Sequence, residues 1–200
     1  MAQPAGNRRS EGGRPPATSR GELERVAFTL FARDGFDRTS VDDIAAEAGI
    51  ARRTFFRYFP SKADLVWGDF PGLLEAMESR LRRCPDTVPL PQALHDAALE
   101  FNALPAEQLP AHRQRMTLIL TVPTLLANST LRFREWRAVV AEFAARRLGL
   151  EPHDIPPVVI GYSALGASLA AYERWLAEPD SDLAPLLHEA FDSLSGGLGH

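Results

Sequence analysis

The stretch SVDDIAAEAGIARRTFFRYF, residues 40–59, decides the fold. Ser40, followed three residues later by Asp43, is a pair typical of the first turn of a helix. Gly49 permits the left-handed backbone of a tight turn, and a second short helix then ends near Phe59. Two short helices joined in this way form a helix-turn-helix, whose second helix enters the DNA major groove. The stretch therefore predicts a DNA-reading element.

The sequence on either side of this stretch is also helical. Apolar residues at helical spacing begin at Leu23 and stop at Gly35, and Ser61 is placed to cap a fourth helix. Pro71 interrupts the pattern of that fourth helix soon after it begins. We therefore expect either one long connecting helix kinked at Pro71 or two helices that meet there.

The remainder of the chain predicts further helices and no sheet, because no segment alternates with the period of a strand. Apolar spacing and prolines place these helices near 90–103, 107–122, 128–148, 156–178 and 182–195. We expect an all-α protein of about nine helices. Its parts are a disordered basic arm at 1–19, a three-helix helix-turn-helix domain at 20–68, and a helical ligand-binding and dimerisation domain at 69–200.

The charge is unevenly distributed along the chain. The formal net charge is −4, which by itself argues against binding DNA. Residues 1–20 hold four arginines and one glutamate, a net charge of +3; residues 21–68 hold seven basic and eight acidic groups, a net charge of −1. Residues 69–200 hold eleven basic and seventeen acidic groups, a net charge of −6. The acidic part of the chain is thus expected to face away from phosphates.

Several function classes are excluded by what the sequence lacks. Cys84 is the single cysteine, so no internal disulfide can form, and no run of about 20 apolar residues predicts a membrane span. No signal peptide precedes the helices, and we expect a cytoplasmic protein that does not bind membranes. The histidines are scattered singly, and no phosphate loop or nucleophile elbow is present. We expect no catalytic site, no metal and no cofactor.

The basic and hydroxyl side chains around the second helix are the candidate DNA contacts. Arg52 and Arg53 stand at its start, where an arginine can donate two hydrogen bonds to guanine. The other candidates are suited to phosphates, and Thr54 also to a thymine methyl group. The full set is Ser40, Arg52, Arg53, Thr54, Arg57, Tyr58 and Lys62. The alternative is that the three arginines only form a solvated helix face.

At this point the sequence resembles a known family. Residues 20–68 resemble the DNA-binding domain of TetR-family bacterial regulators. The motifs that carry the resemblance are FARDGF (31–36), TSVDDIA (39–45), Ala48-Gly49 and YFPSK (58–62). The resemblance implies a homodimer that binds a palindromic operator and releases it when a small molecule binds. Two positions depart from the family pattern. Arg53 stands where the family usually has a small residue, and Phe56 stands where it usually has a phosphate-binding tyrosine.

A narrower resemblance extends into the second part of the chain. The chain is similar to TetR-type regulators found with mycofactocin biosynthesis genes in actinobacteria. The similar segments are residues 52–62, WGDF (67–70), EFN (100–102), RQRM with LIL (113–120), and WR with VVAEF (136–143). This resemblance implies control of genes for a peptide-derived redox cofactor. It also suggests a hydrophobic effector such as an acyl-CoA.

Large apolar residues in the middle helices are candidates for the lining of an effector pocket. They are Phe101, Met116, Ile119, Leu120, Phe133, Trp136, Tyr162 and Trp175. The alternative for each is an ordinary place in the core. Arg113, Arg115 and Arg132 lie beside these apolar stretches and would suit an anionic ligand, or else form salt bridges.

The last two helices are expected to form the dimer interface. Residues 158–178 carry bulky side chains spaced by glycine, alanine and serine, so a second helix can approach closely. The second half of the interface would come from Leu183, Leu186, Leu187, Ala190, Phe191 and Leu194. The alternative is a purely intramolecular core.

Three further expectations complete the interpretation. The segment GGRPP (12–16) resembles half of a minor-groove hook, although a tail that helps only through its charge is the alternative. Effector binding is expected to tilt the helix that starts at Ser61, with Pro71 as the weak point. The alternative to a regulator is a helical lipid or acyl-ligand binding protein that binds no operator.

Overall fold

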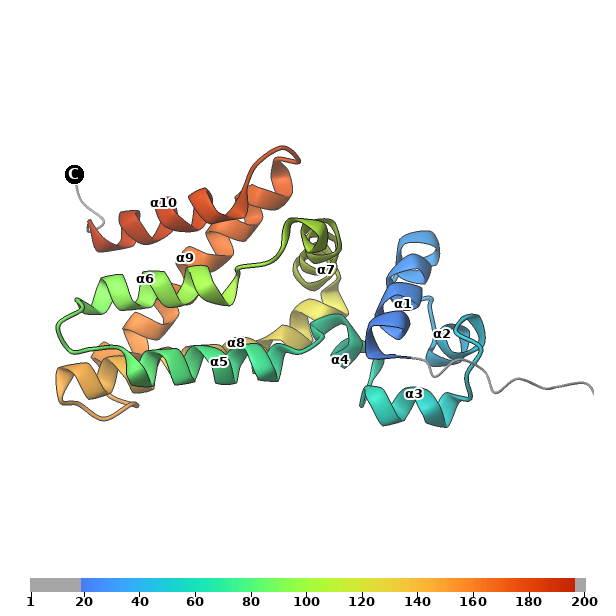
Figure 1. Ribbon diagram of the computed structural model, residues 1–200, viewed down its shortest axis with the longest axis horizontal. Helices are drawn as coiled ribbons and strands as arrows, with labels where there is room; N and C mark the ends of the chain where they lie inside the picture. The colour runs from blue at the N-terminus through green and yellow to red at the C-terminus, as the bar shows by residue number, and fades with distance from the viewer. Residues whose placement is uncertain (1–18, 197–200) are drawn as a thin grey trace, which may run out of the picture.

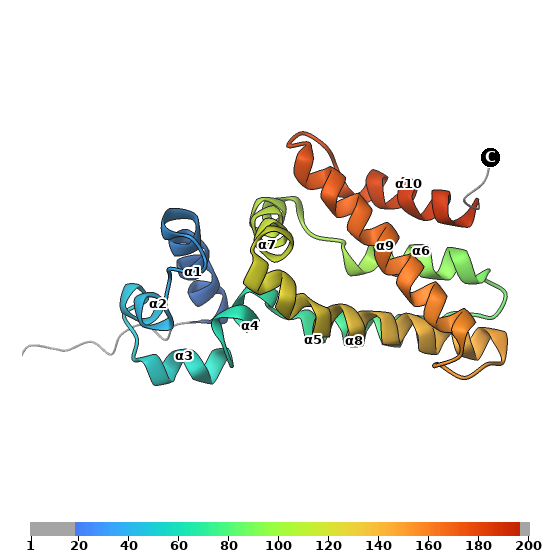
Figure 2. The same cartoon turned by 180° about the vertical axis from the view of Figure 1, so that it is seen from behind.

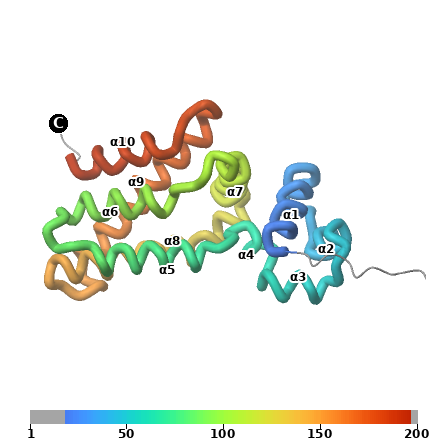
Figure 3. The backbone as a smooth tube through the Cα atoms, in the orientation of Figure 1, coloured from blue at the N-terminus to red at the C-terminus, as the bar shows by residue number. Residues whose placement is uncertain are grey.

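The computed structural model describes residues 19–196, in which it contains ten α-helices, one 3₁₀ turn and no strand. Figure 1 shows an elongated arrangement, with α1, α2 and α3 at one end and the larger group of α5, α6, α8, α9 and α10 at the other. The helices α4 and α7 lie between the two groups, as the tube in Figure 3 also shows. The all-helical prediction is confirmed. The basic arm expected at 1–19, including the GGRPP segment, lies outside the described residues except for Ser19.

The first group is the helix-turn-helix and the helix that supports it. These helices are α1 (Arg20–Asp34), α2 (Val41–Glu47) and α3 (Arg52–Tyr58). Ile44, Phe55 and Phe59 are fully buried against α1 and set the angle between α2 and α3. Gly49 has a φ of +65°, the left-handed conformation that the turn between these helices requires.

The connection to the larger group differs from the prediction. α4 (Lys62–Trp67) and α5 (Phe70–Arg83) are separate helices, and the break between them is at Gly68, not at Pro71. Gly68 has φ +59° and ψ −135°, a conformation that is essentially confined to glycine. Pro71 lies in the first turn of α5, where its missing N–H has no helical partner to lose. Of the two alternatives, the one with two helices that meet is confirmed, but the break lies at Gly68, three residues before the predicted Pro71.

Prolines also start the later helices. The elements are α6 (Leu90–Phe101), the 3₁₀ turn η1 (Ala106–Gln108), α7 (Leu109–Thr121), α8 (Pro123–Leu148), α9 (Ile155–Ala177) and α10 (Leu183–Ser195). In α6, α7, α8 and α9 a proline occupies one of the first two positions. The helix expected near 128–148 starts five residues earlier, because Pro123 opens α8 instead of ending the helix before it.

Two hydrophobic cores hold the helices together. One contains side chains of α5, α6, α8, α9 and α10, including Trp136 and Phe143. The other joins the helix-turn-helix to α7 and to Tyr172 and Trp175 in the second half of α9. The end of the molecule that carries α3 therefore shares its core with helices far along the chain, although the two groups are distinct in Figure 1.

The helix α9 is the most apolar of the long helices. Its 23 residues contain an 18-residue window of mean hydropathy 1.3, which by length and composition alone matches a membrane span, although no such segment was expected. In the structure α9 packs against α8 and α10, and in the view of Figure 2 it runs obliquely to both of them. Only 33% of its most apolar window is buried, so one face has no partner within the described chain.

Candidate functional site

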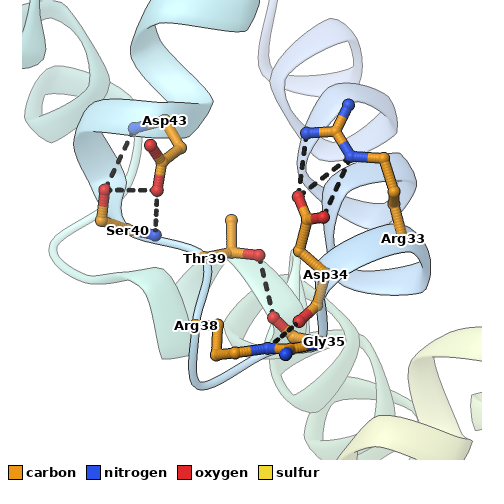
Figure 4. Close-up of polar contacts among 7 residues, drawn as sticks. All are labelled: Arg33, Asp34, Gly35, Arg38, Thr39, Ser40 and Asp43. Carbon is orange, nitrogen blue, oxygen red and sulfur yellow. Dashed lines mark hydrogen bonds and ion pairs between the residues drawn. The ribbon is translucent and has the colours of Figure 1, made fainter.

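The start of α2 is a complete capping box, drawn in Figure 4. The Asp43 backbone N–H donates to Ser40 Oγ at 3.1 Å, and the Ser40 N–H donates to Asp43 Oδ2 at 2.8 Å. The Ser40 hydroxyl also donates to Asp43 Oδ2, at 2.7 Å, and this hydrogen bond together with the one from the Ser40 N–H holds the pKa of the Asp43 carboxyl below its ordinary value. The buried Thr39 donates its hydroxyl to the Gly35 carbonyl at 2.9 Å, which closes the loop between α1 and α2. The local sequence thus fixes α2, on which α3 rests.

The basic side chains of α3 are exposed. Arg52 lies 2.5 Å from Asp42 Oδ2 and also covers the ring of Phe56, which is 43% exposed. Arg57 lies over the ring of Tyr58, at 5.2 Å from its centroid. Arg53 is exposed and forms no ion pair with the part of the chain that the structure describes. The three arginines predicted as DNA contacts are thus on one short helix, and Arg53 is the least engaged.

Three of the candidate phosphate contacts are half-buried or have partners within the protein. Lys62 donates to the Phe36 and Thr39 carbonyls at 2.5 and 2.7 Å, and its ammonium lies over the Phe36 ring. Burial lowers the pKa of Lys62, and its two hydrogen bonds hold the loop before α2. The Ser40 hydroxyl is held by Asp43, and Thr54 is half-buried. Sequence spacing could not show that Lys62 and Ser40 have partners within the protein.

A cavity of about 320 Å³ lies between α7 and the larger group of helices, beside α4. Its lining is mostly aromatic and aliphatic, and it comes from α4, α5, α6, α7, α8 and α9, with Glu24 from α1. This volume is at the lower end for small-molecule sites and is roughly twice the ~150 Å³ of an apolar cavity that holds one benzene ring. Five of the residues predicted to line a pocket do line it: Phe101, Met116, Ile119, Phe133 and Trp136.

The other three predicted lining residues lie elsewhere. Leu120 packs on the core that contains the helix-turn-helix. Trp175 is buried under Arg113, whose guanidinium lies 4.1 Å from the centre of its ring. Tyr162 is 59% exposed on the outer face of α9, where Arg137 stacks on it at 3.6 Å. Helical spacing alone does not tell which side of α7 or α9 faces the cavity.

The cavity also contains a polar network that the sequence analysis missed. His112 Nε2 lies 2.8 Å from Tyr172 Oη, and the Tyr172 hydroxyl donates to Asn102 Oδ1. Burial lowers the pKa of His112 to about 4 and raises the pKa of the Tyr172 phenol, so both groups are uncharged at neutral pH. These three residues are far apart in the sequence, and no motif connects them.

Only one of the three arginines singled out in the sequence lines the cavity. Arg115 Nη2 donates to Glu24 Oε2 at 2.8 Å, and its Nη1 donates to the Val66 carbonyl. Arg113 instead donates to backbone carbonyls at and beyond the end of α9, and Arg132 pairs with Asp64 at 2.9 Å. Arg115 therefore joins the cavity wall on α7 to α1 and α4.

Comparisons with known proteins agree with this arrangement. Residues 25–66 match the model of bacterial regulatory proteins of the tetR family, and residues 88–199 match the MftR C-terminal domain. Over 186 residues, the chain is 41% identical to a Mycobacterium tuberculosis protein assigned as a mycofactocin biosynthesis transcriptional regulator, MftR, covering 93% of this chain and 94% of that protein. The chain belongs to the TetR family. It is a helix-turn-helix transcriptional regulator with an MftR-type C-terminal domain, and not an enzyme.

Solved structures of TetR-family regulators share the fold. The fatty acid degradation regulator FadR of Bacillus halodurans superposes with a TM-score of 0.64 at 18% identity, covering 94% of this chain and 99% of that one. FadR of Thermus thermophilus, in complex with lauroyl-CoA, superposes with a TM-score of 0.56 at 24% identity, covering 91% and 96%. At these identities the likeness establishes the fold alone.

The outer face of α9 carries a row of exposed apolar side chains. Ile155, Val159 and Tyr162 are each more than half exposed, and the small Gly166 and Ala170 continue the same stripe. On α10 the predicted interface residues Leu183, Leu187 and Phe191 are buried in the chain's own cores, so they are not available to a second copy. Leu186 and Ala190 are half-buried, and Leu194 is exposed.

Proposed function

We propose that this TetR-family regulator is a repressor that binds a palindromic operator as a homodimer and releases it when a hydrophobic effector fills the cavity. Arg53, Arg52 and Arg57 of α3 would meet the DNA, with Arg53 reading a base. Genes related to mycofactocin are the proposed targets, because the C-terminal domain and the 41% identical relative are of the MftR type. The proposal includes a cytoplasmic location.

The observation that carries the effector response is the double role of Arg115. This side chain lines the cavity and at the same time holds Glu24 on α1 and the Val66 carbonyl on α4. An occupant that displaces Arg115 thereby acts on the two helices that support the helix-turn-helix. A ligand shifts an equilibrium only by contacts that differ between the two states, and Arg115 supplies such a contact.

A hydrophobic effector is supported by the aromatic lining of the cavity. Acyl-CoA thioesters are the candidate class, since FadR proteins of the same fold have been solved with lauroyl-CoA and stearoyl-CoA. The cavity volume of about 320 Å³ is suited to the acyl portion of such a molecule.

The homodimer is supported by the unpartnered face of α9. Burying exposed Ile155, Val159 and Tyr162 side chains against a second copy would remove apolar surface from water, at roughly 25 cal/mol per Å². The adjacent Gly166 and Ala170 would permit close approach of the partner helix. The dimer would set the distance between the two copies of α3, which must match half-sites roughly 34–36 Å apart.

The proposal is tested by fluorescence anisotropy with the DNA upstream of the regulator's own gene. We expect a sequence-specific complex that weakens steeply with salt and that dissociates when lauroyl-CoA is added. A scrambled DNA of the same length is the control. Lauroyl-CoA binding without any sequence-specific complex would instead favour the helical lipid-binding alternative.

A further inference from the structure

The polar network of the cavity has a fixed hydrogen-bond direction. Asn102 Nδ2 donates to the Ala98 carbonyl at 2.7 Å, so Asn102 Oδ1 must be the atom that faces Tyr172. The Tyr172 hydroxyl therefore donates to Asn102, and it can only accept from His112. His112 carries its proton on Nε2, and Nδ1 is left with a lone pair. This tautomer is assigned by the network, which leaves no other arrangement of donors.

His112 Nδ1 is an accessible acceptor. His112 Nδ1 has no hydrogen-bond partner among residues 19–196, and the protein does not fully enclose it. Trp67 Nε1, another unpartnered polar atom of the cavity wall, is fully enclosed by protein and is closed to an occupant. Because burial keeps the pKa of His112 at about 4, the ring stays neutral and Nδ1 remains an acceptor at neutral pH.

The charges of the cavity wall oppose an anionic occupant. Glu24, Asp69 and Arg115 are the ionisable groups of the lining besides His112 and Tyr172. Glu24 already neutralises Arg115 at 2.8 Å, and the exposed Asp69 adds a carboxylate that forms no ion pair with residues 19–196. A carboxylate placed among these groups would lose its hydration without gaining a free cation, which is unfavourable in a protein interior.

We propose that the part of the effector that enters the cavity is uncharged and carries a hydrogen-bond donor, an O–H or N–H group, that binds His112 Nδ1. The inference rests on the proposed effector-binding role of the cavity and specifies its chemistry. A long-chain alcohol meets the requirement, and so does the amide-bearing arm of a coenzyme A thioester. A free fatty acid does not, because it enters as a carboxylate.

Three probes of equal chain size test the proposal by isothermal titration calorimetry on the full chain. 1-Decanol and its isomer 1-methoxynonane differ in having or lacking an O–H donor, and decanoate replaces the hydroxyl by a charge. We expect decanol to bind roughly threefold to tenfold more tightly than the ether, the range for one neutral hydrogen bond. Decanoate should bind more weakly than decanol.

A His112→Phe variant is the matched control. Its ring fills nearly the same space but has no nitrogen acceptor, so the preference for decanol over the ether should disappear, whereas His112→Gln, whose amide oxygen can still accept, should keep part of it. Equal affinities of the wild type for decanol and the ether, tighter binding of decanoate, or no binding of decanol would each overturn the inference. If operator binding persists in those cases, the proposed DNA-binding function still stands.

Discussion

Arg115 on α7 and Glu24 on α1 form an ion pair of 2.8 Å between two helices that are 91 residues apart in sequence. Both side chains are about four-fifths buried, with exposed fractions of 20% and 21%. The same guanidinium reaches the Val66 carbonyl on α4 and lies over the Phe28 ring on α1. One side chain of the cavity wall is therefore held by both helices that carry the helix-turn-helix.

Replacing Arg115 by methionine should separate effector binding from DNA release. The change leaves Glu24 without its partner and should lower the free energy of unfolding by about 1.5–3 kcal/mol, the range for hydrogen bonds to charged groups. Effector binding should persist while its effect on operator affinity shrinks, as measured by urea denaturation and by anisotropy with and without lauroyl-CoA. Arg174→Met is the control, because the Arg174–Glu178 pair is exposed. An unchanged effector response in Arg115→Met would contradict the proposed coupling.

Gly68 should tolerate a side chain less well than Gly35 does. Both have positive φ, +59° and +86°, so alanine costs backbone strain of roughly 1–3 kcal/mol at either site. A Cβ at Gly68 would also lie 2.6 Å from Arg115 Nη1, whereas a Cβ at Gly35 would meet nothing within 4 Å. Thermal unfolding should therefore show a larger loss for Gly68→Ala. Combining it with Arg115→Met should recover part of that loss, and strictly additive effects would show that no such contact exists.

Arg53 and Lys62 should behave in opposite ways. Arg53→Ala should weaken operator binding by about 1–3 kcal/mol and change sequence preference, with stability nearly unaltered.

Lys62→Met removes two hydrogen bonds to the loop before α2 and should lower stability by about 1–3 kcal/mol. The salt dependence of DNA affinity should change little in Lys62→Met. A salt slope reduced by about one would instead identify Lys62 as a phosphate contact.

Acidification should destabilise the protein through His112. Its pKa is about 4 in the folded protein and near 6.5 when unfolded, so the unfolded chain binds the extra proton between these values. Stability is therefore lost as the pH falls from 6.5 towards 4, by about 2 kcal/mol between pH 7 and pH 5. His112→Gln should show less of this loss in urea denaturation at the two pH values. The exposed His153→Gln should match the wild type, and equal losses in all three would refute the assignment.

The helix-turn-helix domain was largely predictable from the sequence. The capping box at Ser40 and the turn at Gly49 depend on contacts within a few residues, so residue type and spacing determine them. The helical spacing of Phe55 and Phe59 indicates the side of α3 that is buried against α1. The prolines were harder to interpret, because a proline can end one helix or open the next. Pro71 and Pro123 both open helices here.

The resemblance to a known family identified the class of protein, which the spacing of apolar residues alone could not do. TetR membership and the MftR-type domain followed from motifs such as YFPSK, and the comparisons confirmed both. The family pattern gave Lys62 a place near DNA, but the loop from Phe36 to Thr39 takes up its hydrogen bonds. A motif records which residue is present and does not record which atoms it contacts.

The sequence by itself determined the helices and the helix-turn-helix, because these depend on local hydrogen bonding and periodicity, and its motifs determined the family. Only the tertiary structure decided the cavity and its connection to α1 and α4. His112, Tyr172 and Asn102 meet because three helices pack together, and Arg115 finds Glu24 across 91 residues of chain. The side of a helix that faces a neighbour depends on how all the helices pack, so Trp175 and Tyr162 turned away from the cavity while Tyr172, on the same helix, turned into it.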